Sequence, residues 1–122
     1  MVIKLSKDYL NTLTQWRRDF HQYPEPGWLE FRTTAKIAEQ LEAWGYEAKV
    51  GREIIAGERL GVPSPNDLDY FYQLAMQEGV SSKWLSKMEG GYTGVIAILD
   101  SGKPGPTIAF RVDIDALPIT EA

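Results

Sequence analysis

The sequence predicts an α/β fold in which helices pack on a small mixed sheet. Apolar residues recur at three- and four-residue steps in four segments, which is typical of amphipathic helices, and short apolar or alternating runs between and after them are typical of strands. The 122 residues suit one domain, and 43% apolar with 25% charged residues is ordinary for a globular chain. The chain contains no cysteine, so we expect a core that is held without disulfides.

Two amphipathic helices are expected in the first part of the chain. Ser6 can cap a helix that begins near Lys7 and ends before Pro24, because proline cannot donate the helical hydrogen bond. A second helix is expected to begin near Glu30 and to end at Gly45, which suits a left-handed C-terminal cap. Its buried face is expected to consist of Phe31, Thr34, Ile37, Ala38, Leu41 and Trp44.

The middle of the chain is expected to form one strand and two further helices. Residues 46–50 alternate between apolar and charged side chains, which predicts a half-buried strand. Within residues 52–91, Ser64 can cap a helix that ends at Gly79. A short helix then follows, capped by Ser81 or Ser82, and its buried side is expected to consist of Trp84, Leu85 and Met88.

Two strands are expected near the end of the chain. Residues 95–99 are nearly all apolar, which predicts a strand covered on both faces. Residues 100–105 have the composition of a hairpin turn, and residues 107–112 are expected to form the second strand. That strand would lead directly into Asp113 and Asp115, whose side chains would share one side if the strand continues.

A few charged residues are candidates for chemistry. Asp113 and Asp115 could bind a cation, orient a metal-bound histidine or hold a proton, or they could form an acidic surface turn that ends the strand. His21 is the only histidine and lies near a helix C-terminus, where it could line a site or play a structural role. Arg17 and Arg18 could hold an anionic substrate or form a solvated helix face.

Several classes of site and partner are disfavoured. One histidine and no cysteine cannot complete a zinc site. The net charge is −4 and the basic residues are scattered, so we expect no nucleic-acid partner. No stretch is apolar enough for a membrane span or a signal peptide, so we expect no membrane partner and a cytoplasmic location. The four tryptophans are expected to be core anchors: Trp16, Trp28, Trp44 and Trp84.

Two motifs resemble one family. The run at residues 16–25, Trp-Arg-Arg-Asp-Phe-His-Gln-Tyr-Pro-Glu, resembles the opening signature of the metal-dependent amidohydrolases and aminoacylases, which include hippurate hydrolases and auxin-conjugate hydrolases. The run at residues 111–119, Arg-Val-Asp-Ile-Asp-Ala-Leu-Pro-Ile, resembles a later signature of the same family. Residues 52–91 are similar to a helical insert in the A subunit of aminobenzoyl-glutamate utilization proteins, which belong to the same family.

The resemblance implies a place within a larger enzyme. Residues 1–122 would form the N-terminal part of a zinc-peptidase-like catalytic domain, with residues 52–91 as the insert. The family's Cys-Gly-His-Asp-x-His cluster, its catalytic glutamate and its dimerisation domain would lie outside this chain. The family cleaves the amide of p-aminobenzoyl-glutamate or a similar N-acyl amino acid with two zinc or manganese ions, and a related B subunit is a possible partner. The chain alone is expected to be inactive and to bind no metal tightly.

The resemblance also assigns roles to individual residues. Asp115 matches the catalytic acid that lies beside the metal centre and orients a ligand. Asp113 stands where related peptidases have a metal-binding histidine, so it is a possible ligand. His21 and Glu25 match positions that line the site or support it structurally, and no cofactor-binding residue is expected. Two alternatives remain: a non-catalytic module that self-associates or complements a missing remainder, and an unrelated small α/β binding domain.

Overall fold

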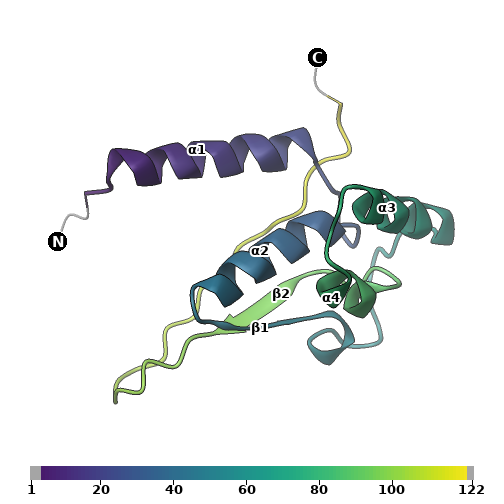
Figure 1. Ribbon diagram of the computed structural model, residues 1–122. Coiled ribbons are helices and arrows are strands. Elements are labelled where there is room, and N and C mark those ends of the chain that lie inside the picture. Colours follow the sequence, from purple (N-terminus) through teal and green to yellow (C-terminus); the bar gives the residue numbers. More distant parts are fainter. Residues whose placement is uncertain (1–3, 121–122) are drawn as a thin grey trace.

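A computed structural model describes residues 4–120 (Figure 1). Helices pack on a two-stranded sheet, which confirms the predicted α/β class. The strands that the structure describes are antiparallel, whereas a mixed sheet was expected. In chain order, the elements are α1 Lys7–Gln22, α2 Phe31–Ala43, β1 Glu47–Val50, the 3-10 turn η1 Gly51–Glu53, α3 Pro65–Gln77, α4 Ser82–Leu85, the 3-10 turn η2 Ser86–Met88 and β2 Val95–Ile98.

The helix boundaries follow from local capping. Ser6, Ser64 and Ser81 each accept a backbone N–H hydrogen bond on their side-chain oxygen at the start of α1, α3 and α4. These caps confirm the predicted starts. Helix α2 differs, because the side chain of its N-cap residue Glu30 makes no capping hydrogen bond.

The core lies between α2, α3, α4 and one face of the sheet. Strands β1 and β2 pair with Val50 opposite Val95 and Glu47 opposite Ile98, and α2 contacts both strands. Residues 52–91 contribute about half of the core, so this region is integral to the packing. The expectation that residues 52–91 form a helical insert stays a prediction. The buried cluster consists of Leu29, Phe31, Ala35, Ala38, Val50, Ala75, Trp84, Leu85 and Met88.

The prediction of a second strand near the end of the chain is wrong. Residues 107–112 form no strand, and Ile108, Phe110 and Val112 are 73%, 91% and 78% exposed. Because no apolar surface covers them in the described chain, burial gives no free energy to support pairing. Strand β2 is also covered on one face only, since Ile98 is 57% exposed. The expectation that it would be buried on both faces is therefore wrong too.

The tryptophan expectation holds for one residue out of four. Trp84 is 2% exposed and lies in the core, whereas Trp44 is 51% exposed and Trp16 and Trp28 are only partly buried. Helix α1 contains no buried residue, so its apolar stripe finds little cover within residues 4–120. No helix in this part of the chain is long and apolar enough to cross a membrane.

Candidate functional site

The first turn of α2 is capped by a residue from the preceding loop. The Glu25 carboxylate accepts hydrogen bonds from the backbone N–H groups of Arg32 at 2.9 Å and Thr33 at 2.6 Å. These are two of the four N–H groups that a helix start leaves without a helical partner. Burial raises the pKa of Glu25, and the hydrogen bonds from Thr33 and Arg32 oppose that rise. Glu25 therefore fixes the loop at residues 24–30 to α2.

A second buried carboxylate joins α2 to the turn before β2. The Thr93 hydroxyl donates a hydrogen bond to Glu30, and the Gly94 N–H donates to the Thr34 hydroxyl oxygen at 2.9 Å. Burial raises the pKa of Glu30, and the nearby negative charge of Asp115 raises it further. The start of α2 thus holds the turn at residues 92–94.

The C-terminal segment reaches the same place. It runs back from the turn after β2 toward the junction of α1 and α2 (Figure 1), and the Ala116 N–H donates to the Glu25 carbonyl at 2.9 Å. Asp115, the residue before Ala116, is exposed. Asp113 is also exposed and forms an ion pair with Arg111 at 2.9 Å. No strand fixes these two aspartates, so strand alternation does not place their side chains on one side.

The two sequence motifs meet at one groove. Residues 20–24 at the end of α1 form one wall and residues 116–120 form the other, around a cavity of about 660 Å³. His21 lies in the first wall, one residue after Phe20. The structure therefore brings His21 and Glu25 next to the segment that follows Asp115, although the motifs lie at opposite ends of the chain. The groove is lined by Phe20, His21, Gln22, Pro24, Ala116, Leu117, Ile119 and Thr120.

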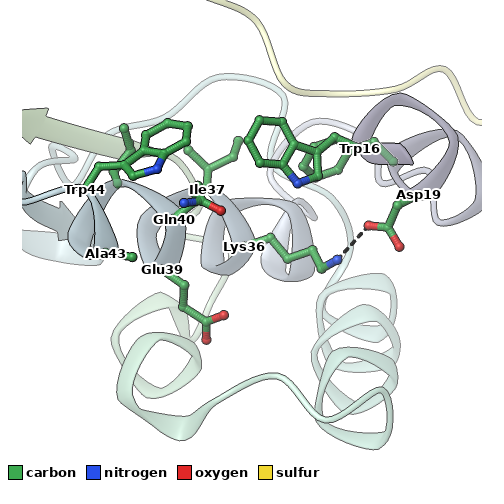
Figure 2. Close-up of a pocket in the computed structure, with 10 residues that line it drawn as sticks. Trp16, Asp19, Lys36, Ile37, Glu39, Gln40, Ala43 and Trp44 are labelled. Carbon is green, nitrogen blue, oxygen red and sulfur yellow. Dashed lines mark hydrogen bonds and ion pairs between the residues drawn. The ribbon is translucent and has the colours of Figure 1, made fainter. Parts of the chain in front are cut away.

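A second groove of about 380 Å³ lies between α1 and α2 (Figure 2). Trp16 and Trp44 stand on its walls with ring centroids 5.9 Å apart. Lys36 forms an ion pair with Asp19 at 2.8 Å, and Arg32 binds the same carboxylate at 2.8 Å. Because Asp19 is already engaged, the groove presents mainly apolar surface.

Zinc in proteins is bound by Cys, His, Asp or Glu side chains. Structural and catalytic zinc sites use three or four protein ligands. Within residues 4–120, no group of three or more His, Asp or Glu side chains lies close enough to hold a metal ion. The described donors, including Asp113, Asp115 and His21, therefore do not by themselves fit such a site.

A clamp around Arg59 was not foreseen from the sequence. Its two terminal nitrogens donate hydrogen bonds to the carbonyls of Gly91 at 2.7 Å and Gly90 at 3.0 Å. Its guanidinium carbon lies 3.8 Å from the Tyr92 ring centroid and 5.0 Å from that of Trp28. In the sequence, the pair Gly90-Gly91 indicates only a helix end, and nothing near Arg59 indicates its partners. We call these five residues the Arg59 clamp.

Glu30 also has a larger role than the sequence indicates. Its position before a helix is explained by the helix dipole alone, which does not require burial. In the structure Glu30 is only 9% exposed, and its partner Thr93 lies 63 positions further along the chain. Such a long-range pair leaves no local sequence pattern.

The chain matches part of several longer hydrolases. It is 50% identical over 116 residues to indole-3-acetyl-aspartic acid hydrolase of Enterobacter agglomerans, which covers 94% of this chain and 27% of that protein. It is 47% identical over 110 residues to the A subunit of p-aminobenzoyl-glutamate hydrolase of Escherichia coli, which covers 89% and 25%. This chain is a homologue of both proteins. The chain spans about a quarter of the length of these relatives, and no protein-family model matches it.

The fold comparison agrees with the sequence comparison. The crystal structure of an aminobenzoyl-glutamate utilization protein from Klebsiella pneumoniae superposes with a TM-score of 0.86 at 47% identity, over 91% of this chain and 28% of that chain. The resemblance inferred from the two motifs is therefore confirmed. An unrelated α/β binding domain is excluded by the same findings.

Proposed function

We propose that this chain forms part of the catalytic domain of an amidohydrolase that cleaves the amide of p-aminobenzoyl-glutamate or a similar N-acyl amino acid. The observation that carries the proposal is the 47–50% identity to two hydrolases over about nine-tenths of the chain. The convergence of both motifs at the start of α2 supports it, because residues that serve one site must be neighbours in space.

Within this proposal, Asp115 is the residue closest to the chemistry. It is solvent-accessible, and the next residue, Ala116, is held to the Glu25 carbonyl, so Asp115 can orient a group that enters the site. Asp113 is a second possible contact, and His21 and Glu25 line or support the site. The zinc or manganese ion belongs to the complete enzyme and would depend on ligands beyond those described here.

The proposal extends to partner, compartment and pathway. A related B subunit is the proposed partner, because the relative from Escherichia coli is named as one subunit of its hydrolase. The enzyme is proposed to act in the cytoplasm on a breakdown product of folate. These three proposals concern the complete enzyme of which this chain would form a part.

The chain by itself is expected to be inactive. We expect no hydrolysis of p-aminobenzoyl-glutamate by residues 1–122 with added zinc or manganese, because the described donors cannot assemble a metal site. Release of p-aminobenzoate can be followed by absorbance or chromatography. Turnover above a metal-only blank would contradict this expectation.

A chimera tests the function directly. The matching 110-residue stretch of the Escherichia coli relative is replaced by this chain, and the hybrid is assayed together with the B subunit of that hydrolase. We expect hydrolysis to be retained and Asp115→Asn to lower kcat/KM by at least about a hundredfold, the scale typical for a positioned polar group. Asp69→Asn, an exposed aspartate on α3, is the control and should leave the rate unchanged. An inactive but folded hybrid would sink the proposal.

Self-association is a second candidate, favoured by exposed apolar side chains. Leu60 and Phe110 are 93% and 91% exposed, and Ile98 on the open sheet face is 57% exposed. Exposed apolar side chains can be buried by association with a second molecule. Sedimentation velocity at several concentrations tests this candidate: a shift to larger species supports it, and a monomer at all concentrations argues against it.

A further inference from the structure

The Arg59 clamp joins two turns that are far apart in the sequence. Arg59 donates hydrogen bonds to Gly90 and Gly91 and stacks against Tyr92, all in the turn that follows η2. On its other side it lies near the Trp28 ring, whose Nε1 donates to the Leu60 carbonyl at 2.8 Å. Arg59 therefore contacts both the loop before α2 and the turn before β2, and it fixes the distance between these two segments.

Both turns contain a residue with a positive φ angle, and the two turns are in close contact. Trp28 has a φ of 65°, the one non-glycine residue in the described chain with a positive φ. Gly91 has a φ of 84°, and a Cβ at this position would lie 2.8 Å from the Trp28 carbonyl oxygen and 2.5 Å from a Leu68 methyl carbon. Backbone in the left-handed region is costly for most residues and persists only where neighbouring structure fixes it. The turns thus approach each other so closely that only glycine fits.

The clamped loop before α2 also holds the C-terminal segment, because the Glu25 carbonyl accepts a hydrogen bond from the Ala116 N–H at 2.9 Å. Trp28 stands two positions before Glu30, and Tyr92 directly precedes Thr93. Glu30 and Thr93 form a buried hydrogen bond that joins the two clamped segments. A displacement of the loop before α2 would therefore move the Glu25 carbonyl, which holds Ala116, the residue after Asp115.

We propose that Arg59 is a positioning residue of the site: it fixes the two turns that bring Glu30 and Thr93 together and thereby sets the position of Asp115. This inference rests on the proposed function. It gives residues 52–91 a role in catalysis, although no residue of this region lines the groove between the two motifs.

The test uses the active chimera with Arg59→Lys, Arg59→Ala and the control Arg52→Lys. Arg52 also stacks on Tyr92, with its guanidinium carbon 4.1 Å from the ring centroid, but it is exposed. Lysine keeps the positive charge of Arg59 and loses the planar fork that reaches two carbonyls. We expect Arg59→Lys to lower kcat by about tenfold with KM changed less than about twofold, because small misplacements of a catalytic group slow the reaction step. Arg52→Lys should match the wild type.

Two readouts separate positioning from loss of folded protein. The melting curve of Arg59→Lys should remain cooperative above the assay temperature, and millimolar guanidinium should restore part of the activity of Arg59→Ala. Unchanged kcat in Arg59→Lys would overturn the inference, as would a loss that follows the folded fraction alone and is not rescued.

A failure of the proposed function is distinguishable from a failure of this inference. If the wild-type chimera is inactive, the function fails, and the clamp is then tested in the isolated chain by amide NMR shifts. Arg59→Lys should shift the amide signals of Thr93 and Asp115, and Arg52→Lys should leave them in place. Unshifted signals in Arg59→Lys would refute the coupling between the clamp and Asp115.

Discussion

Helix α2 and the segment at residues 107–119 both carry several apolar side chains, yet the environments of these side chains differ. Phe31 at the start of α2 is fully buried, while Phe110 is 91% exposed. The first turn of α2 receives partners from the loop before it and from the turn before β2. Residues 107–112 receive no comparable cover from the described chain. An apolar pattern indicates what a segment needs to bury, and the buried state exists only where the rest of the fold supplies the second surface.

The largest difference in stability is expected between two alanine substitutions, Phe31→Ala in α2 and Phe110→Ala in the C-terminal segment. We expect Phe31→Ala to lower the free energy of unfolding by about 3–5 kcal/mol, because it removes a fully buried ring that packs edge-on against Tyr72 at 5.6 Å between centroids. Phe110→Ala should change it by less than about 0.5 kcal/mol, as is usual for exposed positions. Urea unfolding followed by circular dichroism measures both values.

A large effect of Phe110→Ala would break the comparison. It would mean that the ring is buried in solution against another molecule. Repeating the urea series at several protein concentrations would reveal this, because stability gained by association rises with concentration.

The same contrast explains what could be predicted from the sequence. Caps such as Ser64, the helical steps of α2 to α4 and the alternation in β1 are local patterns, and the structure confirms them. The strand expected at residues 107–112 was also a local pattern, but a strand needs a hydrogen-bonding partner and a covering layer. Neither requirement can be seen in the segment itself.

The candidate site divides in a similar way. The motifs around His21 and Asp115 indicated the resemblance to the amidohydrolases, and their meeting in one groove follows from the fold. The Arg59 clamp and the hydrogen bond between Glu30 and Thr93 join residues more than 30 positions apart. Contacts of this kind depend on the packing of α2 against the turn before β2, so no spacing rule predicts them.

The next largest loss of stability is expected from an alanine substitution at one of two glycines with a positive φ angle. Gly91→Ala should destabilise the chain by about 3 kcal/mol, the sum of a left-handed backbone penalty and overpacking against the Trp28 carbonyl and Leu68. Gly102→Ala, at a φ of 68° with nothing within 4 Å, should cost only about 1 kcal/mol. Thermal melting compares the two variants. Equal losses would show that the turn before β2 is not closely packed.

Two aspartate–arginine pairs of similar length differ in exposure. Asp19 lies 2.8 Å from Arg32, whose side chain is 10% exposed, while Asp113 lies 2.9 Å from Arg111, which is 87% exposed. We expect Asp19→Asn to cost about 1–2 kcal/mol because a largely buried guanidinium loses its nearest carboxylate. Asp113→Asn should cost less than about 0.5 kcal/mol, since exposed pairs contribute little. Urea unfolding of both variants tests this, and a loss of equal size would show that exposure does not decide the strength of these pairs.

The smallest effect is a dependence of stability on pH. Burial raises the folded-state pKa of Glu30 above its ordinary value of 4.5, so the folded chain retains this proton more strongly than the unfolded chain. The resulting stabilisation is complete below pH 4.5 and is lost as the pH rises through the folded-state pKa. Glu30→Gln keeps an acceptor for the Thr93 hydroxyl but cannot ionise.

The wild type should therefore lose stability relative to Glu30→Gln as the pH increases from about 4 to about 7 in a urea unfolding series. Asp19→Asn is a control, because the stabilisation by Asp19 depends on pH in the opposite direction. The hydrogen bond from Arg32 holds the pKa of Asp19 below its ordinary value of 3.8, so its stabilisation is present above that value and is lost as the pH falls. If the difference between wild type and Glu30→Gln stayed constant over this range, Glu30 would not be a buried ionising group, and the close contact between α2 and the turn before β2 would have to be revised.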